Sequence, residues 1–376
     1  MSTVIAVPAE TREGERRVAM APSLAPKLVK AGARLQIQAG AGKAAGFSDQ
    51  AFADIDGVEI VEDADTLWSQ ADLVFAVRRP EIERLRQMKP GAGLVGFLAP
   101  WERDEFVGAL AEQKLSAFAV ELIPRISRAQ SMDALSSQAA VAGYKSVLLA
   151  AEHLPRFFPM LTTAAGTIRP AKALVVGAGV AGLQAIATAR RLGARVEAFD
   201  VRSAVAEQVE SLGAKFVDTG VKAEAEGGYA RELTEEEKAQ QQAVLAKHVA
   251  QADVVITTAA IPGRPAPKII TEAMARDMKP GAVLVDLAAE TGGNCELTEA
   301  GQVKRLGSVS IVGPTDVPGM IAEHASEMFA RNLWNFTQPC VGEDGGLTWN
   351  MDDEVYAKSV VSHDGEIRFP AAEEGK

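Results

Sequence analysis

The chain has 376 residues, of which 47% are hydrophobic, 24% charged and 5% aromatic, and its formal net charge is -11 at pH 7. This length suits two globular domains, and the acidic balance argues against a nucleic-acid partner, because phosphate binding relies on lysine and arginine. The only two cysteines, Cys295 and Cys340, have no metal-ligand spacing, so we expect neither a metal site nor a disulfide framework. No apolar run approaches the roughly 18 to 20 residues that span a bilayer, and the N-terminus has no basic region before its apolar run. We therefore expect no secretory signal and no direct membrane insertion.

The first third of the chain alternates short apolar runs with amphipathic stretches. Residues 23–31 and 103–113 have the apolar spacing of helices. Alternation of strands and helices predicts a parallel, doubly wound sheet. The runs expected to be strands are 4–7, 35–38, 73–77, 94–98 and 118–122.

A long Ala-, Ser- and Leu-rich pattern covers residues 132–153, with one glycine and no proline. It predicts a helix that bridges two domains. The apolar, threonine-rich patch that follows, up to Pro170, predicts a projecting hairpin.

A second alternation begins at Ala171 and predicts a second doubly wound sheet. A helical pattern over 320–336 is expected to return to the first domain. The predicted class is α/β, with two doubly wound parallel-sheet (Rossmann-like) domains joined by a long helix. The predicted domains are residues 1–135 plus about 318–376, and residues 136–317. The runs expected to be strands of the second sheet are 173–176, 196–199, 215–217, 254–257, 283–287 and 309–312.

Polar, charge-dense residues over 218–251 interrupt the second alternation. Their composition predicts a solvated loop followed by an exposed helix. We place an inserted mobile loop near residues 218–235.

A dinucleotide-binding fingerprint, Gly177-Ala178-Gly179-Val180-Ala181-Gly182, follows the strand run 173–176 and opens a helix over 180–192. Gly177 permits a tight turn, Gly179 lets the backbone approach a pyrophosphate, and Gly182 lets helix and strand pack closely. The pyrophosphate is expected at the helix N-terminus, where free N–H groups favour anions.

Asp200 ends the next strand, 18 residues after Gly182, at the spacing of a carboxylate that accepts from the adenosine ribose hydroxyls. Its charge would repel the extra phosphate of NADP, which favours NAD. Arg202 weakens that inference, because an arginine here can pair with a 2′-phosphate. Val201, Thr258 and Ala259 complete the cofactor-binding candidates next to these strand ends.

The segment from Pro124 to Gln138, PRISRAQSMDALSSQ, closely resembles a signature of the NAD-binding subunit of proton-translocating NAD(P) transhydrogenases. Similar blocks extend the resemblance over the whole chain. They include Pro8-Ala9-Glu10, Glu15-Arg16-Arg17-Val18-Ala19, Thr163-Ala164-Ala165-Gly166, Glu207-Gln208-Val209-Glu210-Ser211-Leu212-Gly213, Gly227-Gly228-Tyr229-Ala230, Ile261-Pro262-Gly263-Arg264-Pro265-Ala266-Pro267 and Gly292-Gly293-Asn294-Cys295.

The resemblance implies that NAD(H) binds here as a substrate, and that hydride passes directly to NADP(H) on a partner domain. A membrane-spanning partner subunit would carry protons. The chain would form a homodimer and lie in the cytoplasm, peripheral to the inner membrane. By resemblance, Arg125, Gln130, Asp133 and Ser136 line the nicotinamide side of the cleft, and Tyr229 lies on a mobile loop that closes over the nucleotide.

Without the resemblance, Arg125 and Arg128 are interpreted as surface cations and Asp133 as a helix-start carboxylate. Hydride transfer needs orientation and exclusion of water rather than a general acid or base, so polar side chains suffice in either role.

Alanine dehydrogenase shares the fold and several of these blocks, and it is the rival enzyme hypothesis. Arg17 corresponds to the arginine that this enzyme uses for the substrate carboxylate. Its Lys-Glu-Pro is replaced by Arg79-Pro80-Glu81, its catalytic histidine by Ala99, and an aspartate by Glu290. Oxidation of an amino acid requires a proton acceptor beside the amine, and neither of the last two positions carries the usual one.

A nucleotide-sensing module without chemistry is the third hypothesis. Such a module would share the fingerprint but would need no set of residues facing the nicotinamide.

Overall fold

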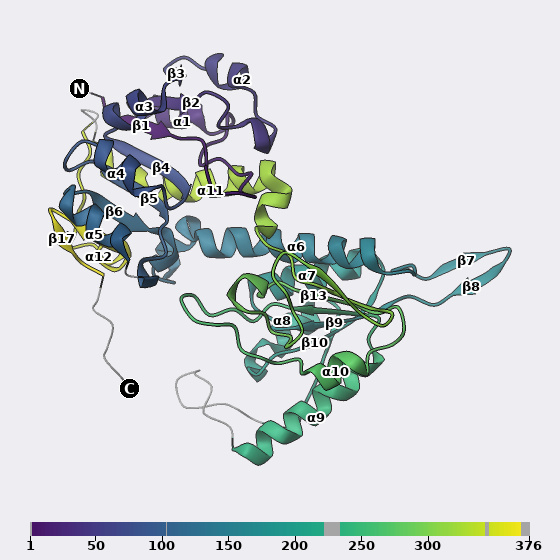
Figure 1. Cartoon of the computed structure of the whole chain (residues 1–376). Helices are drawn as coiled ribbons and strands as arrows, with labels where there is room; N and C mark the ends of the chain where they lie inside the picture. Colours follow the sequence, from purple (N-terminus) through teal and green to yellow (C-terminus); the bar gives the residue numbers. More distant parts are fainter. Residues whose placement is uncertain (1, 103, 222–233, 343–345, 370–376) are drawn as a thin grey trace. The chain divides into compact units, whose positions relative to one another are not determined.

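The computed structural model describes residues 2–102, 104–221, 234–342 and 346–369. The chain folds as two compact units (Figure 1). Unit 1 contains residues 1–138 and 318–376, and unit 2 contains residues 139–317.

Unit 1 is built on an eight-stranded sheet, in the order β17-β16-β6-β5-β4-β1-β2-β3. The six strands from β1 to β6 are parallel, whereas β16 and β17 add an antiparallel edge. The strands are β1 (Val4–Val7), β2 (Arg34–Gln38), β3 (Val58–Val61), β4 (Leu73–Arg78), β5 (Gly93–Phe97), β6 (Ser116–Ala119), β16 (Val360–His363) and β17 (Glu366–Ile367).

Successive side chains of β1 and β4 alternate between two buried cores, as expected for a sheet covered on both faces. Ile5 and Phe75 belong to the core that includes residues of α1 (Ala25–Lys30) and α11 (Ala322–Thr337). Ala6 and Val74 belong to the core that includes residues of α3 (Ala64–Gln70), α4 (Ile82–Gln87) and α5 (Glu105–Glu112). Unit 1 also contains the helices α2 (Asp49–Ala53) and α12 (Glu354–Ser359).

Unit 2 is built on a seven-stranded sheet, in the order β11-β10-β9-β12-β13-β15-β14. All of its pairs are parallel except that between β14 and β15. The strands are β9 (Lys172–Val176), β10 (Arg195–Phe199), β11 (Lys215–Phe216), β12 (Val254–Thr257), β13 (Val283–Asp286), β14 (Val303–Leu306) and β15 (Val309–Val312).

Helices cover both faces of the second sheet. One core joins β9 to α7 (Val180–Arg191) and to the part of α6 (Ala134–His153) that belongs to unit 2. The other core joins β9 to α9 (Glu235–Gln251) and α10 (Glu272–Arg276). Strand order reverses between β9 and β12, so the crevice outside their carboxyl ends is the expected place for a ligand.

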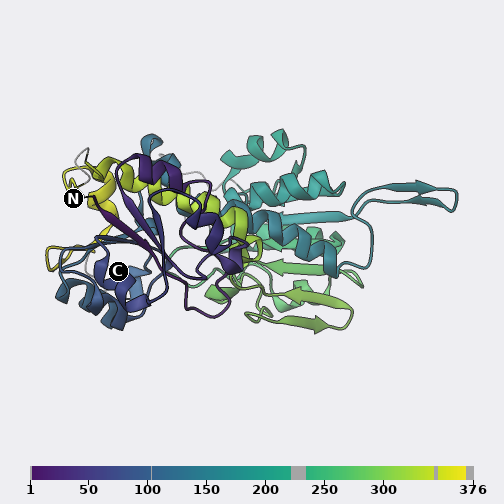
Figure 2. The ribbon, with the colours of Figure 1, turned by 90° about the horizontal axis from the view of Figure 1, so that it is seen from above.

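The hairpin expected before Pro170 is confirmed. Strands β7 (Leu161–Thr163) and β8 (Gly166–Ile168) pair antiparallel, and all six of their residues are exposed. Figure 2 shows this hairpin extending away from the rest of unit 2.

Some expectations from the sequence are wrong in detail. The strand expected over 118–122 ends at Ala119, where a 3-10 turn, Val120–Leu122, begins. The helix expected to be exposed after the insertion is only partly so, because Leu245 and Val249 on α9 are buried in the core of unit 2. Residues 222–233, with the predicted loop residue Tyr229, lie outside the described residues. No helix in the described ranges is long and apolar enough to cross a membrane.

Candidate functional site

The loop between β9 and α7 is shaped by two glycines of the fingerprint. Gly177 has a φ of +99°, a backbone conformation that residues with a side chain rarely adopt. Its N–H donates to the carbonyl oxygen of Phe199 at 2.8 Å, which ties the loop to β10. A Cβ atom on Gly182 would lie 1.8 Å from the carbonyl oxygen of Gly177. Only glycine therefore fits at position 182 in this turn.

The third glycine of the fingerprint faces open space. Gly179 is the N-cap residue of α7, and a Cβ atom placed on it would meet no atom of the described part of the chain within 4 Å. No side chain of the described residues caps this helix end, and Val180 in its first turn is 44% exposed. The first N–H groups of a helix have no intrahelical acceptor, so this end of α7, with Ala181 and Gly182 in its first turn, suits an anion such as a pyrophosphate.

Thr258 and Ala259 follow β12 and lie next to the loop. The Thr258 hydroxyl donates to the carbonyl oxygen of Gly177 at 3.1 Å. The N–H of Ala259 donates to Oδ1 of Asn294 at 3.0 Å, and Nδ2 of Asn294 donates to the carbonyl oxygens of Ala259 and Pro267, at 2.8 and 2.9 Å. The fully buried Asn294 side chain thus fixes the segment that follows β12.

The sequence alone assigned no role to Asn294 or to Gly143. The signal for Asn294 was the block Gly292-Gly293-Asn294-Cys295, and the signal for Gly143 was the single glycine in the long helix. A Cβ atom on Gly143 would lie 2.1 Å from the carbonyl oxygen of Ala181. Gly143 therefore lets α6 approach the first turn of α7, within unit 2.

Asp200, directly after β10, lies beside the fingerprint loop. Its Oδ2 accepts from the N–H of Ala178 at 2.7 Å, and its carboxylate also pairs with the guanidinium of Arg202. Burial alone would raise the pKa of the Asp200 carboxyl, but the hydrogen bonds from Arg202 and Ala178 outweigh it and hold that pKa below its usual range. The carboxylate is therefore charged at neutral pH. Val201, between the two, is 45% exposed.

The four residues expected near the nicotinamide belong to unit 1. Arg125 and Gln130 are exposed, and neither side chain has a hydrogen-bond partner among the described residues. Asp133 caps the start of α6, because its two oxygens accept from the N–H of Ser136 at 2.8 Å and from its hydroxyl at 2.6 Å. The helix-start interpretation of Asp133 is thus confirmed, while a contact of any of the four with a nucleotide stays a prediction.

The interpretation of Arg128 as a surface cation is also confirmed. Its guanidinium is exposed and forms a two-pronged ion pair with Asp353, with distances of 2.9 and 2.5 Å. The described residues contain no cluster of metal-binding side chains.

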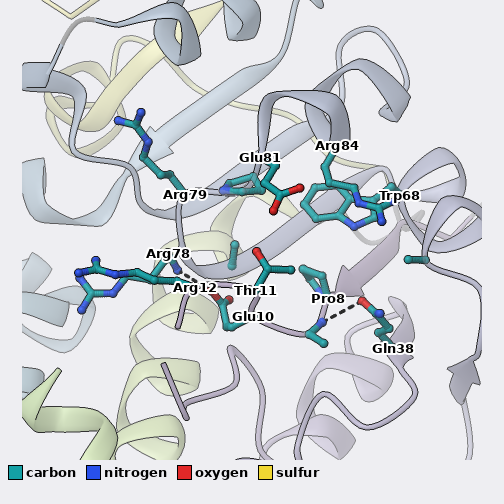
Figure 3. A pocket seen from close by; sticks show the side chains of 14 residues that line it. Pro8, Glu10, Thr11, Arg12, Gln38, Trp68, Arg78, Arg79, Glu81 and Arg84 are labelled. Atoms are coloured by element: carbon teal, nitrogen blue, oxygen red, sulfur yellow. Dashed lines mark hydrogen bonds between the residues drawn. The ribbon is translucent and has the colours of Figure 1, made fainter. Parts of the chain in front are cut away.

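Unit 1 has its own pocket, of about 60 Å³, outside the carboxyl ends of β1 and β4, where its strand order reverses (Figure 3). Glu10 accepts from the N–H groups of Val77 and Arg78, at 2.6 and 3.1 Å. Arg79 pairs with Glu102 at 2.6 Å and with Asp104. The Glu10 side chain at the pocket is thus held by main-chain N–H groups, and the Arg79 side chain by neighbouring carboxylates.

Arg17, which the resemblance matches to the substrate-binding arginine of alanine dehydrogenase, is 3% exposed. Its Nε and Nη2 donate to Glu15 at 2.7 and 2.5 Å, and its Nη1 donates to Gln138 at 2.8 Å. All three nitrogens of the guanidinium are thereby bonded within unit 1.

Comparison with known proteins shows the family to which the chain belongs. The model of the alanine dehydrogenase/PNT N-terminal domain matches residues 6–142, and that of the C-terminal domain matches residues 146–370. The chain belongs to the alanine dehydrogenase/PNT family. Its C-terminal model continues past unit 2, whose last residue is Val317, into the segment that folds with unit 1.

Within the family, the chain is more similar to transhydrogenase subunits than to alanine dehydrogenases. It is 48% identical to the first part of the NAD(P) transhydrogenase alpha subunit of Rhodospirillum rubrum, over 98% of both chains. The crystal structure of transhydrogenase from Sinorhizobium meliloti superposes with a TM-score of 0.88, at 44% identity, covering 97% of this chain and 99% of that one. Alanine dehydrogenase of Mycolicibacterium smegmatis is 30% identical, over 97% of this chain and 94% of its own. These relatives support the role of an NAD(P) transhydrogenase subunit.

Proposed function

We propose that this chain is the NAD(H)-binding subunit of a proton-translocating, Re/Si-specific NAD(P) transhydrogenase. It transfers hydride between NADH bound here and NADP⁺ bound on a partner domain. The observation that carries the proposal is the full-length similarity to the first part of a transhydrogenase alpha subunit, in a chain whose fingerprint loop lies beside the charged Asp200. The Rossmann loop alone would fit a nucleotide sensor equally well.

Each part of the loop has a task in holding the nucleotide. The open space beside Gly179 admits the pyrophosphate to the N-terminus of α7. Asp200 accepts from the adenosine ribose and disfavours a 2′-phosphate, which selects NAD over NADP. Asn294 fixes the backbone of Ala259 through two hydrogen bonds. The preceding residue, Thr258, donates its hydroxyl to the carbonyl oxygen of Gly177 in the fingerprint loop.

The bound nucleotide supplies the hydride, and the protein supplies orientation and exclusion of water. Arg125 and Gln130 present polar side chains without internal partners among the described residues, as positioning of a carboxamide requires. Asp133 and Ser136 orient each other at the start of α6, and they contribute polar groups without a proton-transfer role.

Partner subunits complete the reaction. The Rhodospirillum rubrum relative is named as one portion of an alpha subunit, which implies that further portions exist. We propose that they carry the NADP-binding domain and the membrane-spanning proton path. The chain would then act in the cytoplasm, at the inner membrane, through these partners.

We propose a homodimer as the state of the chain itself. The hairpin of β7 and β8 is the support, because Met160 (64% exposed), Leu161 (36%) and Ile168 (45%) offer apolar side chains on a projecting element. Sedimentation of the wild-type chain should give twice its mass of 39.7 kDa, and Met160→Ser/Leu161→Ser/Ile168→Ser should shift it toward the monomer.

A mixing assay tests the activity. The purified chain is combined with an NADP-binding transhydrogenase domain, and hydride transfer from NADH to an NADP analogue is followed optically. Transfer that depends on both proteins is expected. NADH binding without transfer in any such mixture would favour the sensor hypothesis.

A further inference from the structure

The carboxylate of Asp200 already accepts four hydrogen bonds. Oδ2 accepts from the N–H of Ala178 at 2.7 Å and from Nη2 of Arg202 at 3.0 Å. Oδ1 accepts from the main-chain N–H of Arg202 at 2.8 Å and from its Nε at 3.0 Å. A carboxylate offers about four lone-pair positions, so its accepting capacity is used in full.

These four donors differ in how easily they can move away from the Asp200 carboxylate. Two are main-chain N–H groups, of Ala178 at the fingerprint loop and of Arg202 directly after β10, so they are fixed by the fold. The other two belong to one guanidinium at the end of a flexible side chain. The Arg202 side chain is 49% exposed, whereas the Asp200 side chain is 6% exposed. Only the guanidinium can be exchanged without moving the backbone.

A ribose diol presents two O–H donors to a carboxylate, as the guanidinium does with Nε and Nη2. We propose that the Arg202 side chain is a built-in competitor of the ribose diol at Asp200, and that it sets the affinity and the selectivity of the nucleotide site. This inference rests on the proposed function, in which Asp200 receives the adenosine ribose. It adds that NADH must displace a bound guanidinium rather than enter a free acceptor.

The same pair affects selectivity against a 2′-phosphate. While Arg202 lies on Asp200, it neutralises the charge that would repel that phosphate. Once displaced, the guanidinium remains near enough to pair with the phosphate, because it is anchored two residues away. Arg202 therefore weakens NADH binding and, at the same time, reduces the discrimination against NADPH.

The test is fluorescence titration of the full-length chain with NADH and NADPH, for the wild type, Arg202→Ala and Arg202→Lys. Removal of the guanidinium should tighten NADH about threefold to tenfold, as expected for loss of a half-exposed, two-pronged ion pair, and should weaken NADPH. Lysine keeps the charge but cannot pair through two fixed donors, so Arg202→Lys should fall between the other two proteins.

Arg276→Ala is the matched control, since Arg276 is 58% exposed and pairs through Nε and Nη2 with Glu272 on α10. It should bind NADH as the wild type does. Unchanged or weaker NADH binding by Arg202→Ala would overturn the inference, as would equal tightening by the control. A wild-type chain that does not bind NADH at all would instead refute the proposed function, so the two failures are distinguishable.

Discussion

Two glycines of the loop between β9 and α7 have opposite surroundings. A substitution at one of them should therefore affect the stability of the fold, and a substitution at the other should affect nucleotide binding. A methyl group on Gly182 would meet the carbonyl oxygen of Gly177, whereas one on Gly179 would have no neighbour within 4 Å among the residues that the structure describes. We expect Gly182→Ala to lower the free energy of unfolding by roughly 1 to 3 kcal/mol, because the backbone must shift. Gly179→Ala should change it by less than about 0.5 kcal/mol and still weaken NADH binding, since the methyl group narrows the approach to the helix N-terminus.

Thermal unfolding and NADH titration of both variants give the two readouts. Wild-type NADH affinity in Gly179→Ala would contradict the placement of the pyrophosphate at this helix end.

A substitution at Gln130 should distinguish NADH binding from hydride transfer. Most of the NADH affinity should come from the fingerprint loop and Asp200, so contacts that only position the reacting rings matter chiefly for rate. Gln130→Asn keeps the amide but shortens its reach, and a misplacement of about 1 Å can cost on the order of a hundredfold. We expect a nearly unchanged NADH dissociation constant and hydride transfer slowed at least about tenfold.

Single-turnover transfer in the reconstituted complex measures this rate. The control is Gln50→Asn, the same shortening at an exposed glutamine of α2. Normal transfer by Gln130→Asn would remove Gln130 from the site, and a proportional loss of NADH binding would make it an ordinary binding residue.

At the scale of elements, Glu121 joins the ends of two strands of unit 1. It follows β6, and its Oε1 accepts from the N–H groups of Leu98 and Ala99, which follow β5, at 2.9 and 2.6 Å. Burial raises the pKa of the Glu121 carboxyl from 4.5 to about 7. The folded chain therefore keeps this proton in a pH range where the unfolded chain has lost it, so the free energy of unfolding should fall as the pH rises from 4.5 to about 7.

Glu121→Gln retains an acceptor for both N–H groups and cannot ionise. Relative to the wild type, it should gain stability between pH 5 and pH 8, by on the order of 3 kcal/mol at most. Urea unfolding at both pH values measures the difference, with Glu112→Gln at an exposed position of α5 as the control. The same pH dependence in Glu121→Gln and in the wild type would mean that the buried carboxyl does not titrate in this range.

The elements that could be predicted from the sequence are those with a strong hydrophobic pattern. The buried parallel strands β9, β12 and β13 are continuous apolar runs, and α7 and α11 have a clear helical period. Among the missed strands, β3 and β14 have partly exposed residues, so their pattern is weak. In the site, spacing alone identified the fingerprint and Asp200. The bond from Asn294 to Ala259 and the pairing of Arg202 with Asp200 depend on side-chain conformations that spacing does not encode.

For the whole molecule, the chemistry that the chain lacks is as informative as the chemistry it has. We expect no NAD-dependent oxidation of alanine by the purified chain. The guanidinium of Arg17 is held by Glu15 and Gln138, and Ala99 offers no proton acceptor. NADH formation from NAD⁺ and alanine is the measurement, with an alanine dehydrogenase assayed in parallel. Sustained turnover by this chain at a comparable rate would restore the rival hypothesis.

The order in which the two units become complete during synthesis follows from their make-up. Unit 2 is continuous, from residue 139 to 317, whereas unit 1 needs residues from both ends of the chain. Phe329, Leu333 and Phe336 of α11 belong to the core of unit 1. A nascent chain that has emerged from the ribosome only as far as Val317 can therefore fold unit 2 but cannot complete unit 1. The N-terminal segment of unit 1, residues 1–138, then keeps an apolar face uncovered until α11 emerges. A chain that stops between Val317 and α11 has a complete unit 2, whereas its incomplete unit 1 is exposed to chaperones and proteases.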